Sequence, residues 1–274
     1  MTIGQLQYRQ LTIGHLVAKH VRTGLLPPSL PQSKPMIHPV ASTGRLRAID
    51  ADEKAARREA LLDAAERLYE PALQLPGVAE IAVVAGMAKG TVYLYFRSRE
   101  ALYLGLHQRQ AQRFFDDLAQ RMAQPGAFDQ EAMLAIVDAH MISRPSFLAL
   151  SNACLATTEA VDEDTNEAFH LALGATMAPV GAGLEQHLPR LRPGDGLRFL
   201  HQGYALLLGL YQLMGQPSQA ALQRRLQARA TLLAQPTCLP QMGDFRTEAH
   251  AALRGLWQQA QTVGLAPVGQ EPPR

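Results

Sequence analysis

The chain has 274 residues, of which 47% are hydrophobic, and its 26 basic and 24 acidic side chains give a net charge of +2. This length suggests about two domains, and the composition favours a globular soluble protein over a disordered one. No apolar run reaches the roughly 18 residues that a membrane helix needs, so we expect a cytoplasmic protein. The near-neutral total neither indicates nor excludes nucleic acid, because a basic patch can lie within a neutral chain.

Residues 1–53 are predicted to form a disordered N-terminal extension. The segment contains five prolines and several glycines but no sustained hydrophobic periodicity. It also lacks the apolar stretch of a secretory signal peptide. Two interpretations stay open. Either its basic residues form an arm that reaches DNA phosphates or the minor groove, or residues 1–35 are an extension upstream of a start at Met36.

Residues 57–69 are predicted to form the first helix of the folded part. Apolar side chains recur there at helical spacing and define one buried stripe. They are Leu61, Leu62, Ala65, Leu68 and Tyr69. Pro71 and Pro76 follow, and we expect these prolines to end the helix.

Residues 77–96 are predicted to form two short helices joined by a tight turn. The first helix has one apolar stripe, made by Val78, Ile81, Ala82 and Ala85. We expect Gly86 to supply the positive φ that the turn needs and Met87 to point back into a small core.

The second of these helices, from about Ala88 to Phe96, presents polar side chains around a bare surface. Val92 and Phe96 lie four residues apart, so both should face inward. Gly90 and Leu94 should stand opposite the core, flanked by Lys89, Thr91, Tyr93 and Tyr95. A cation, a hydroxyl and two phenols suit a DNA groove, where such groups bond phosphates and base edges. The alternative is an ordinary surface helix that carries two tyrosines.

From about Lys54 to Phe114 the sequence resembles the DNA-binding domain of the TetR family of bacterial transcriptional regulators. Three stretches carry the resemblance: RREALLDAAERLY, EIAVVAGMAKGTVYLYF and RSREALY. It implies an all-α fold, with a three-helix helix-turn-helix domain over residues 54–114 and the motif itself at 77–96. A helical effector-binding and dimerisation domain over residues 115–264 would follow, and then a loose tail over 265–274.

The sequence departs from the usual family pattern at both helix starts of the motif. Gly77 and Ala88 stand where the family commonly has a Ser or Thr cap, and Ala is a poor substitute there. The first helix also lacks the Gly-aromatic ending that is common in the family. These departures affect where each helix begins, and with it the exact base contacts.

The predicted DNA-binding surface comprises the recognition helix, the residues that follow it and the start of the preceding helix. Its members are Val78, Lys89, Gly90, Thr91, Tyr93, Leu94, Tyr95, Arg97 and Arg99. Arg97 and Arg99 should lie near the duplex backbone. Ser98 is a good cap for a fourth helix, which we expect to pass Phe114 and to end at Pro125.

The remainder of the chain is predicted to be helical, because it has helical periodicity and no alternating strand pattern. The expected helices cover residues 129–143, 145–160, 162–188, 197–214, 218–233 and 244–263. The segments from Phe199 to Met214 and from Phe245 to Ala260 are apolar around more of their circumference than a surface helix needs. The resemblance implies that they form a four-helix bundle with a second subunit. The alternative is that both belong to the core of a monomer.

A small-molecule pocket is the other predicted feature of the C-terminal part. Its candidates are apolar or amphipathic residues on helices that should face one another. They are Met133, Val137, His140, Phe147, Cys154, Phe169, Leu173, Met177, Tyr204, Leu207 and Tyr211. Taken singly, residues of these types more often belong to plain core. We expect an apolar effector.

The predicted function is that of a ligand-responsive transcriptional regulator. The resemblance implies a repressor that binds a palindromic operator as a homodimer and is released by a small molecule. The alternative is an activator, or a DNA-binding protein that needs no ligand. No enzyme, cofactor or metal is predicted, because the sequence lacks HExxH, GxSxG, a Walker loop and Cys/His clusters with metal spacing. Cys154 and Cys238 are the only cysteines; we expect free thiols, with a redox sensor as the alternative.

Overall fold

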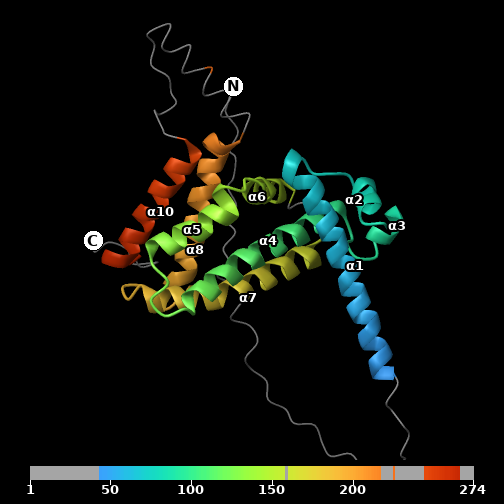
Figure 1. Ribbon diagram of the computed structural model, residues 1–274, viewed down its shortest axis with the longest axis horizontal. Helices are drawn as coiled ribbons and strands as arrows, with labels where there is room; N and C mark the ends of the chain where they lie inside the picture. The colour runs from blue at the N-terminus through green and yellow to red at the C-terminus, as the bar shows by residue number, and fades with distance from the viewer. Residues whose placement is uncertain (1–42, 158–159, 217–224, 226–243, 266–274) are drawn as a thin grey trace, which may run out of the picture. The chain divides into compact units, whose positions relative to one another are not determined.

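The computed structural model describes residues 43–157, 160–216, 225 and 244–265, and within these ranges the chain forms helices and turns without a strand (Figure 1). This confirms the all-α fold class. Residues 1–42 of the predicted extension lie outside the described residues. So do the predicted helix at 218–233, apart from Arg225, and all but the first residue of the tail.

Helix α1 (Thr43–Ala72) begins earlier and ends later than the sequence suggested. Residues 43–53, expected to be disordered, are helical, which corrects that part of the prediction. Pro71 was wrongly expected to stand outside the helix: it lies inside the last turn, and its missing N–H and its ring then disturb only the helix end. The residue after the helix is Leu73, whose φ of +50° is left-handed and whose N–H donates to the Tyr69 carbonyl at 2.8 Å.

The two short helices of the motif are α2 (Val78–Val84) and α3 (Lys89–Val92). Gly86 has a φ of +67°, as expected for the residue that turns the chain between them. Helix α3 is shorter than predicted, because after Val92 the backbone N–H groups bond to carbonyls three residues earlier, as in a 3₁₀-helix, and not four. Phe96 nevertheless bonds back to the Val92 carbonyl at 3.0 Å, and both side chains are buried as expected.

The remaining helices follow the sequence prediction closely. They are α4 (Arg99–Met122), α5 (Gln130–Val137), the π-helix η2 (Asp138–Ile142), α6 (Ser146–Ala156), α7 (Glu163–His187), α8 (Asp195–Leu210), the π-helix η4 (Tyr211–Gly215) and α10 (Phe245–Thr262). Four of them begin at a side-chain cap that accepts a backbone N–H three residues ahead. The caps are Ser98, Asp129, Asp162 and Asp244.

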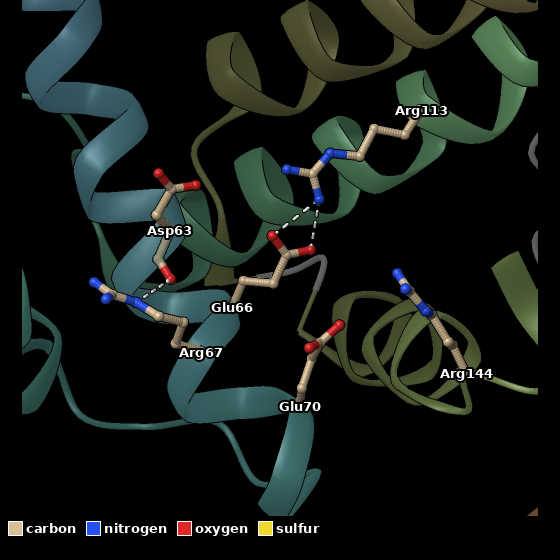
Figure 2. Close-up of a pocket in the computed structure, with 6 residues that line it drawn as sticks. All are labelled: Asp63, Glu66, Arg67, Glu70, Arg113 and Arg144. Atoms are coloured by element: carbon tan, nitrogen blue, oxygen red, sulfur yellow. Dashed lines mark hydrogen bonds and ion pairs between the residues drawn. The ribbon is translucent and has the colours of Figure 1, made fainter.

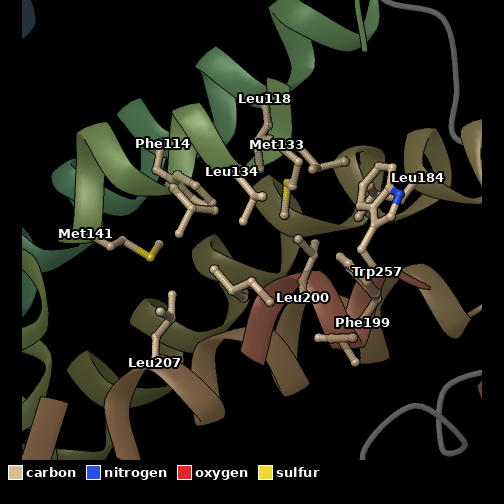
Figure 3. Close-up of a cluster of buried hydrophobic side chains, with 14 of the residues drawn as sticks. Phe114, Leu118, Met133, Leu134, Met141, Leu184, Phe199, Leu200, Leu207 and Trp257 are labelled. Carbon is tan, nitrogen blue, oxygen red and sulfur yellow. The ribbon is translucent and has the colours of Figure 1, made fainter. Parts of the chain in front are cut away.

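Buried side chains form two cores that meet along α4. The N-terminal core contains residues of α1, α2, α3 and the first turns of α4, including Leu61, Ile81, Val92 and Leu102. The C-terminal core begins on α4 at Ala111 and extends through α5, α7, α8 and α10 (Figure 3). Helix α6 contributes to both, with Leu150 and Cys154 in the first core and Phe147 and Leu148 in the second. Two helices therefore connect the cores.

The start of α8 packs directly on the C-terminal third of α7. A Cβ atom on Gly196 would lie 2.0 Å from the carbonyl oxygen of Gly181. Only glycine allows this approach. The predicted start of this helix at residue 197 was wrong by two residues, since α8 begins at Asp195.

Within the described residues, no single helix is long and apolar enough to cross a membrane. One bent pair, Gln130–Ile142 with Ser146–Ala156 at 63°, meets the test of length and composition when the two are taken together.

Candidate nucleic-acid interface and effector site

The outer face of α3 carries exposed groups around a position without a side chain. A Cβ on Gly90 would meet nothing within 4 Å, and Leu94 is 74% exposed. Lys89 is exposed and has no ion-pair or hydrogen-bond partner among the described residues, and Tyr93 is 48% exposed. This face can approach another surface closely and offer it a cation and a phenol.

The other flank of α3 is half-buried. Thr91 and Tyr95 lie there, and Tyr95 packs against the N-terminal core. Arg57 of α1 has a raised pKa, because the carboxylate of Glu53 on the same helix and the hydroxyl of Tyr95 both stabilise its charged form. The guanidinium of Arg57 therefore lies next to this flank and adds a second cation to it.

The two arginines after α3 already have partners within the chain. The Arg97 guanidinium lies 2.9 Å from Asp162 and 3.4 Å from Asp164 at the start of α7. Arg99 donates to the Leu75 carbonyl at 2.6 Å and lies over the Tyr103 ring. To contact a phosphate, Arg97 must exchange two carboxylates for it, whereas Arg99 is held by the core.

Val78, which the sequence analysis included in the DNA-binding surface, is a core residue. Its side chain is 7% exposed and packs in the N-terminal core. The first residue of α2 has to anchor that short helix, because only two other residues of α2, Ile81 and Ala82, are buried. The packing therefore contradicts the prediction that the Val78 side chain contacts DNA.

Several contacts fix the orientation of α2 and α3. The Glu80 carboxylate accepts the Gly77 N–H at 2.6 Å, which supplies half of a capping box in place of the missing Ser or Thr. The Tyr103 hydroxyl donates to the Pro76 carbonyl. The Phe96 ring fits against Gly105 of α4, where a Cβ would lie 3.0 Å from the ring, and the Arg58 guanidinium covers its face. The motif is thus held on three sides.

The predicted pocket residues divide between the two cores. Met133, Val137, Phe147, Met177, Leu207 and Tyr211 are buried in the C-terminal core, and Leu173 and Tyr204 pack against it. Cys154 is buried in the N-terminal core, where Phe169 packs against it. His140 lies at the rim, with Nε2 2.6 Å from Asp117. Burial raises the pKa of the Cys154 thiol to about 12, which argues against a redox sensor at this position.

A buried histidine that the sequence analysis missed lies where the two cores meet. His107 of α4 is 8% exposed, and its ring contacts Phe147 on one side and Phe169 on another. Burial lowers its pKa to about 4, so the ring is neutral. The sequence held a signal for it, because His107 shares a helical stripe with the buried residues Tyr103, Gln110 and Phe114.

The hydrogen bonds around His107 leave one acceptor unused. Nε2 lies 3.4 Å from the hydroxyl of Ser151, which itself donates to the Phe147 carbonyl at 2.9 Å. Since the hydroxyl hydrogen of Ser151 points at the carbonyl, the hydroxyl oxygen can only accept a hydrogen bond from the ring. The hydrogen of the neutral imidazole is therefore on Nε2. Nδ1 is then a buried acceptor without a partner among the described residues. A molecule bound between the cores could donate to it.

The two helices predicted to mediate dimerisation pack on each other within the chain. Leu253 and Leu256 of α10 lie against Gly203 of α8, so part of their apolar surface belongs to the C-terminal core. Each helix also exposes three neighbouring residues without charge, which are Gln202, Ala205 and Leu206 on α8, and Ala251, Gly255 and Gln258 on α10, with Arg198 and Arg254 one turn away.

Among the described residues, no three His, Cys, Asp or Glu side chains gather as a metal site would require.

Two family models and several solved structures match the chain. The family model "Bacterial regulatory proteins, tetR family" matches residues 61–106, and "Tetracyclin repressor-like, C-terminal domain" matches residues 108–262. The reduced form of NemR from E. coli is 20% identical, with a TM-score of 0.45 over 73% of this chain and 96% of that one. A structure assigned to a TetR-family regulator from Mesorhizobium loti is 16% identical, with a TM-score of 0.42 over 74% and 96%. No curated protein matches the sequence.

Proposed function

The chain belongs to the TetR family of bacterial transcriptional regulators, and from this premise we propose that it is a repressor that binds a palindromic operator as a homodimer and leaves it when a small molecule binds. The observation that supports this most is the outer face of α3. Lys89 and Tyr93 project there beside the bare Gly90, and neither side chain has a partner among the described residues that would explain it as structural. Such groups match the donors that read a major groove.

Dimerisation follows from the limited reach of one such motif. A recognition helix contacts few base pairs, and two of them about 34 Å apart read one half-site each on the same side of the duplex. The exposed uncharged residues of α8 and α10 support this, because the core of a protein interface is depleted of charged residues.

Release requires a ligand that prefers the state in which the two motifs are wrongly spaced. Helix α4 is suited to transmit this preference, since it belongs to both cores. His107 marks the place on α4 where one core ends and the other begins, and its Nδ1 acceptor has no partner in the part of the chain that the structure describes. We therefore place the effector beside His107, Phe147 and Phe169. The effector is mainly apolar and carries one hydrogen-bond donor.

Substitution of the α3 residues tests the DNA-binding part of this proposal. Lys89→Ala and Tyr93→Ala should each weaken operator binding by about 1–3 kcal/mol if the side chain reads a base. If it touches only phosphate, all sequences weaken alike and the salt dependence becomes shallower. The operator comes from selection of a random duplex pool by the purified protein, and fluorescence anisotropy measures affinity. Arg121→Ala, an exposed cation in the last turn of α4, is the matched control. Unchanged affinity in the Lys89/Tyr93 double variant would overturn the assignment.

The alternatives are separated by a reporter placed behind the selected operator. Deleting the gene raises expression for a repressor and lowers it for an activator. A DNA-binding protein that needs no ligand would keep its operator affinity in every effector screen.

A further inference from the structure

A row of four carboxylates follows one face of α1. Glu59, Asp63, Glu66 and Glu70 recur at helical spacing, so they point the same way. Arg109 of α4 pairs with the first three, at 3.3 Å, 2.6 Å and 2.7 Å respectively. These pairs hold α1 against α4 and leave Glu70, the last carboxylate of the row, without such a partner.

Beyond the paired carboxylates α1 and α4 separate, and a cleft of about 420 Å³ opens (Figure 2). Arg113 enters it from α4 and pairs with Glu66 at 3.0 Å. Glu70 and Arg144 project into it from opposite sides, Glu70 from α1 and Arg144 from the turn before α6 (Figure 2). Neither of these two side chains has an ion pair or a side-chain hydrogen bond within the described parts of the chain. The cleft therefore presents one unpaired carboxylate, that of Glu70, and the unpaired guanidinium of Arg144. Arg67 also lines the cleft without an ion pair among the described residues, and its Nε donates to the Asp63 carbonyl at 3.4 Å.

A buried acceptor lies in a second, smaller recess that shares Glu66, Glu70, Arg113 and Arg144 with the cleft. Gln110 of α4 is 8% exposed, and its Nε2 donates to Glu66 at 3.2 Å. Because a carboxylate only accepts, this bond fixes which end of the amide is the nitrogen. Oε1 is then the atom that is buried and lacks a partner among the described residues. The Gln110 residue lines this recess of about 40 Å³ together with Glu70, Arg144 and Phe147.

We propose that this cleft binds a small zwitterion of the amino-acid class. Its carboxylate pairs with Arg144, and its ammonium group lies between Glu70 and the Gln110 oxygen. The carbon chain contacts Phe147. A simple anion would leave Glu70 unpaired beside it, and a simple cation would leave Arg144 unpaired, so only a ligand that carries both charges completes the set.

This site shares Phe147 with the effector position beside His107 but uses different charged and polar groups, and its occupancy does not depend on a role in DNA binding. A consequence that does rest on the proposed function is that the ligand would join α1 to α6. It would restrain the motion of the motif relative to the C-terminal core.

Titration calorimetry of the full chain with each of the common L-amino acids tests the site directly. At least one should bind saturably. Its N-acetyl and carboxamide derivatives, which each lack one charge, should fail to bind. Glu70→Gln and Arg144→Gln should each weaken binding about tenfold or more, as expected for a lost charged hydrogen bond. Glu167→Gln, an exposed carboxylate on α7 outside the cleft, should bind as the parent chain does.

Three results would overturn the proposal. The first is that no amino acid binds. The second is that an amino acid binds with an affinity that both cleft variants leave unchanged. The third is that, without ligand, the two substitutions lower thermal stability non-additively, which would show that Glu70 and Arg144 pair directly with each other. Thermal melts of all variants separate loss of the site from loss of folding. Operator affinity of the same variants is measured separately, so the two proposals can fail independently.

Discussion

The surface around the N-terminal core and the border between the two cores differ in the exposure of their polar side chains. Around the N-terminal core, polar side chains point outward, and Lys89 and Tyr93 on α3 remain exposed. At its border with the C-terminal core, polar groups are buried instead, and His107 and Ser151 lie among aromatic rings. The outer face suits a large partner that approaches from solvent. The buried pair suits a small molecule that must enter the protein.

This difference determines what a substitution can disturb. Changing an outward-facing residue alters binding and leaves folding nearly intact, because exposed side chains contribute little to stability. Changing the buried polar groups alters stability first, since an unpaired or charged group is costly there. Three predictions test the comparison, starting with the largest expected effect.

The largest effect should come from the buried His107. Its pKa is about 4 in the folded protein because of burial, against about 6.5 in an unfolded chain. As the pH falls from about 6.5 to 4, the unfolded state binds a proton that the folded state does not. Stability is therefore lost through this window, by about 3 kcal/mol in total. Urea unfolding as a function of pH measures it.

The His107→Gln variant is the control for that measurement. The substitution lowers stability at every pH. The slope of stability against pH between 6.5 and 4, which counts the protons taken up on unfolding, should be smaller than in the parent chain by the equivalent of about one proton. Equal slopes would mean that His107 is not held neutral, and the contrast between the two cores would fail at its central residue.

A smaller effect should appear directly after the end of α1. Leu73 has a left-handed φ of +50°, which costs a residue with a Cβ about 1–2 kcal/mol. Both Leu73→Gly and Leu73→Ala remove the side chain, so their comparison isolates the backbone. The Gly variant should unfold with a free energy about 1 kcal/mol higher than the Ala variant, whereas in a helix interior Ala would be the more stable. An advantage of Ala would contradict the observed conformation.

The smallest effect should come from the contact that joins the motif to α7. With Asp162→Asn and Asp164→Asn together, Arg97 loses both carboxylates and becomes available to a phosphate. Asn still caps α7, so the helix start is preserved. Operator binding should tighten a few-fold, and its salt slope should steepen by at most about one phosphate contact.

An Arg97→Gln background shows whether this gain acts through the arginine. There the two Asn substitutions should have no effect on affinity. A gain that persists in this background would come from reduced long-range repulsion of DNA and would exclude the proposed exchange of partners.

Much of the N-terminal region could be predicted from spacing alone. The buried stripe of α1, the inward pair Val92 and Phe96, the turn at Gly86 and the bare position at Gly90 all follow from a period of 3.6 residues and from the backbone freedom of glycine. Two details failed because they depend on neighbours. Val78 is buried by the packing of α2, and α3 shortens where the chain must turn towards α4.

The sites in the C-terminal half were less accessible to sequence reasoning. The predicted pocket residues are apolar, and the same pattern describes either core or cavity. His107 and Ser151 are 44 positions apart, and Glu70 and Arg144 even further, so no local pattern pairs them. The two unexpected polar sites each combine helices that only the fold brings together.

Periodicity, caps and glycines act within a few residues, and so the sequence by itself determined the helices, the family and the outward face of the recognition helix. Only the tertiary structure decided which side chains of α1, α4 and α6 come close enough to exchange a hydrogen bond or leave one unmade. Burial and pairing depend on which side chains lie close together in space, and residues far apart in the sequence come close only when the chain folds.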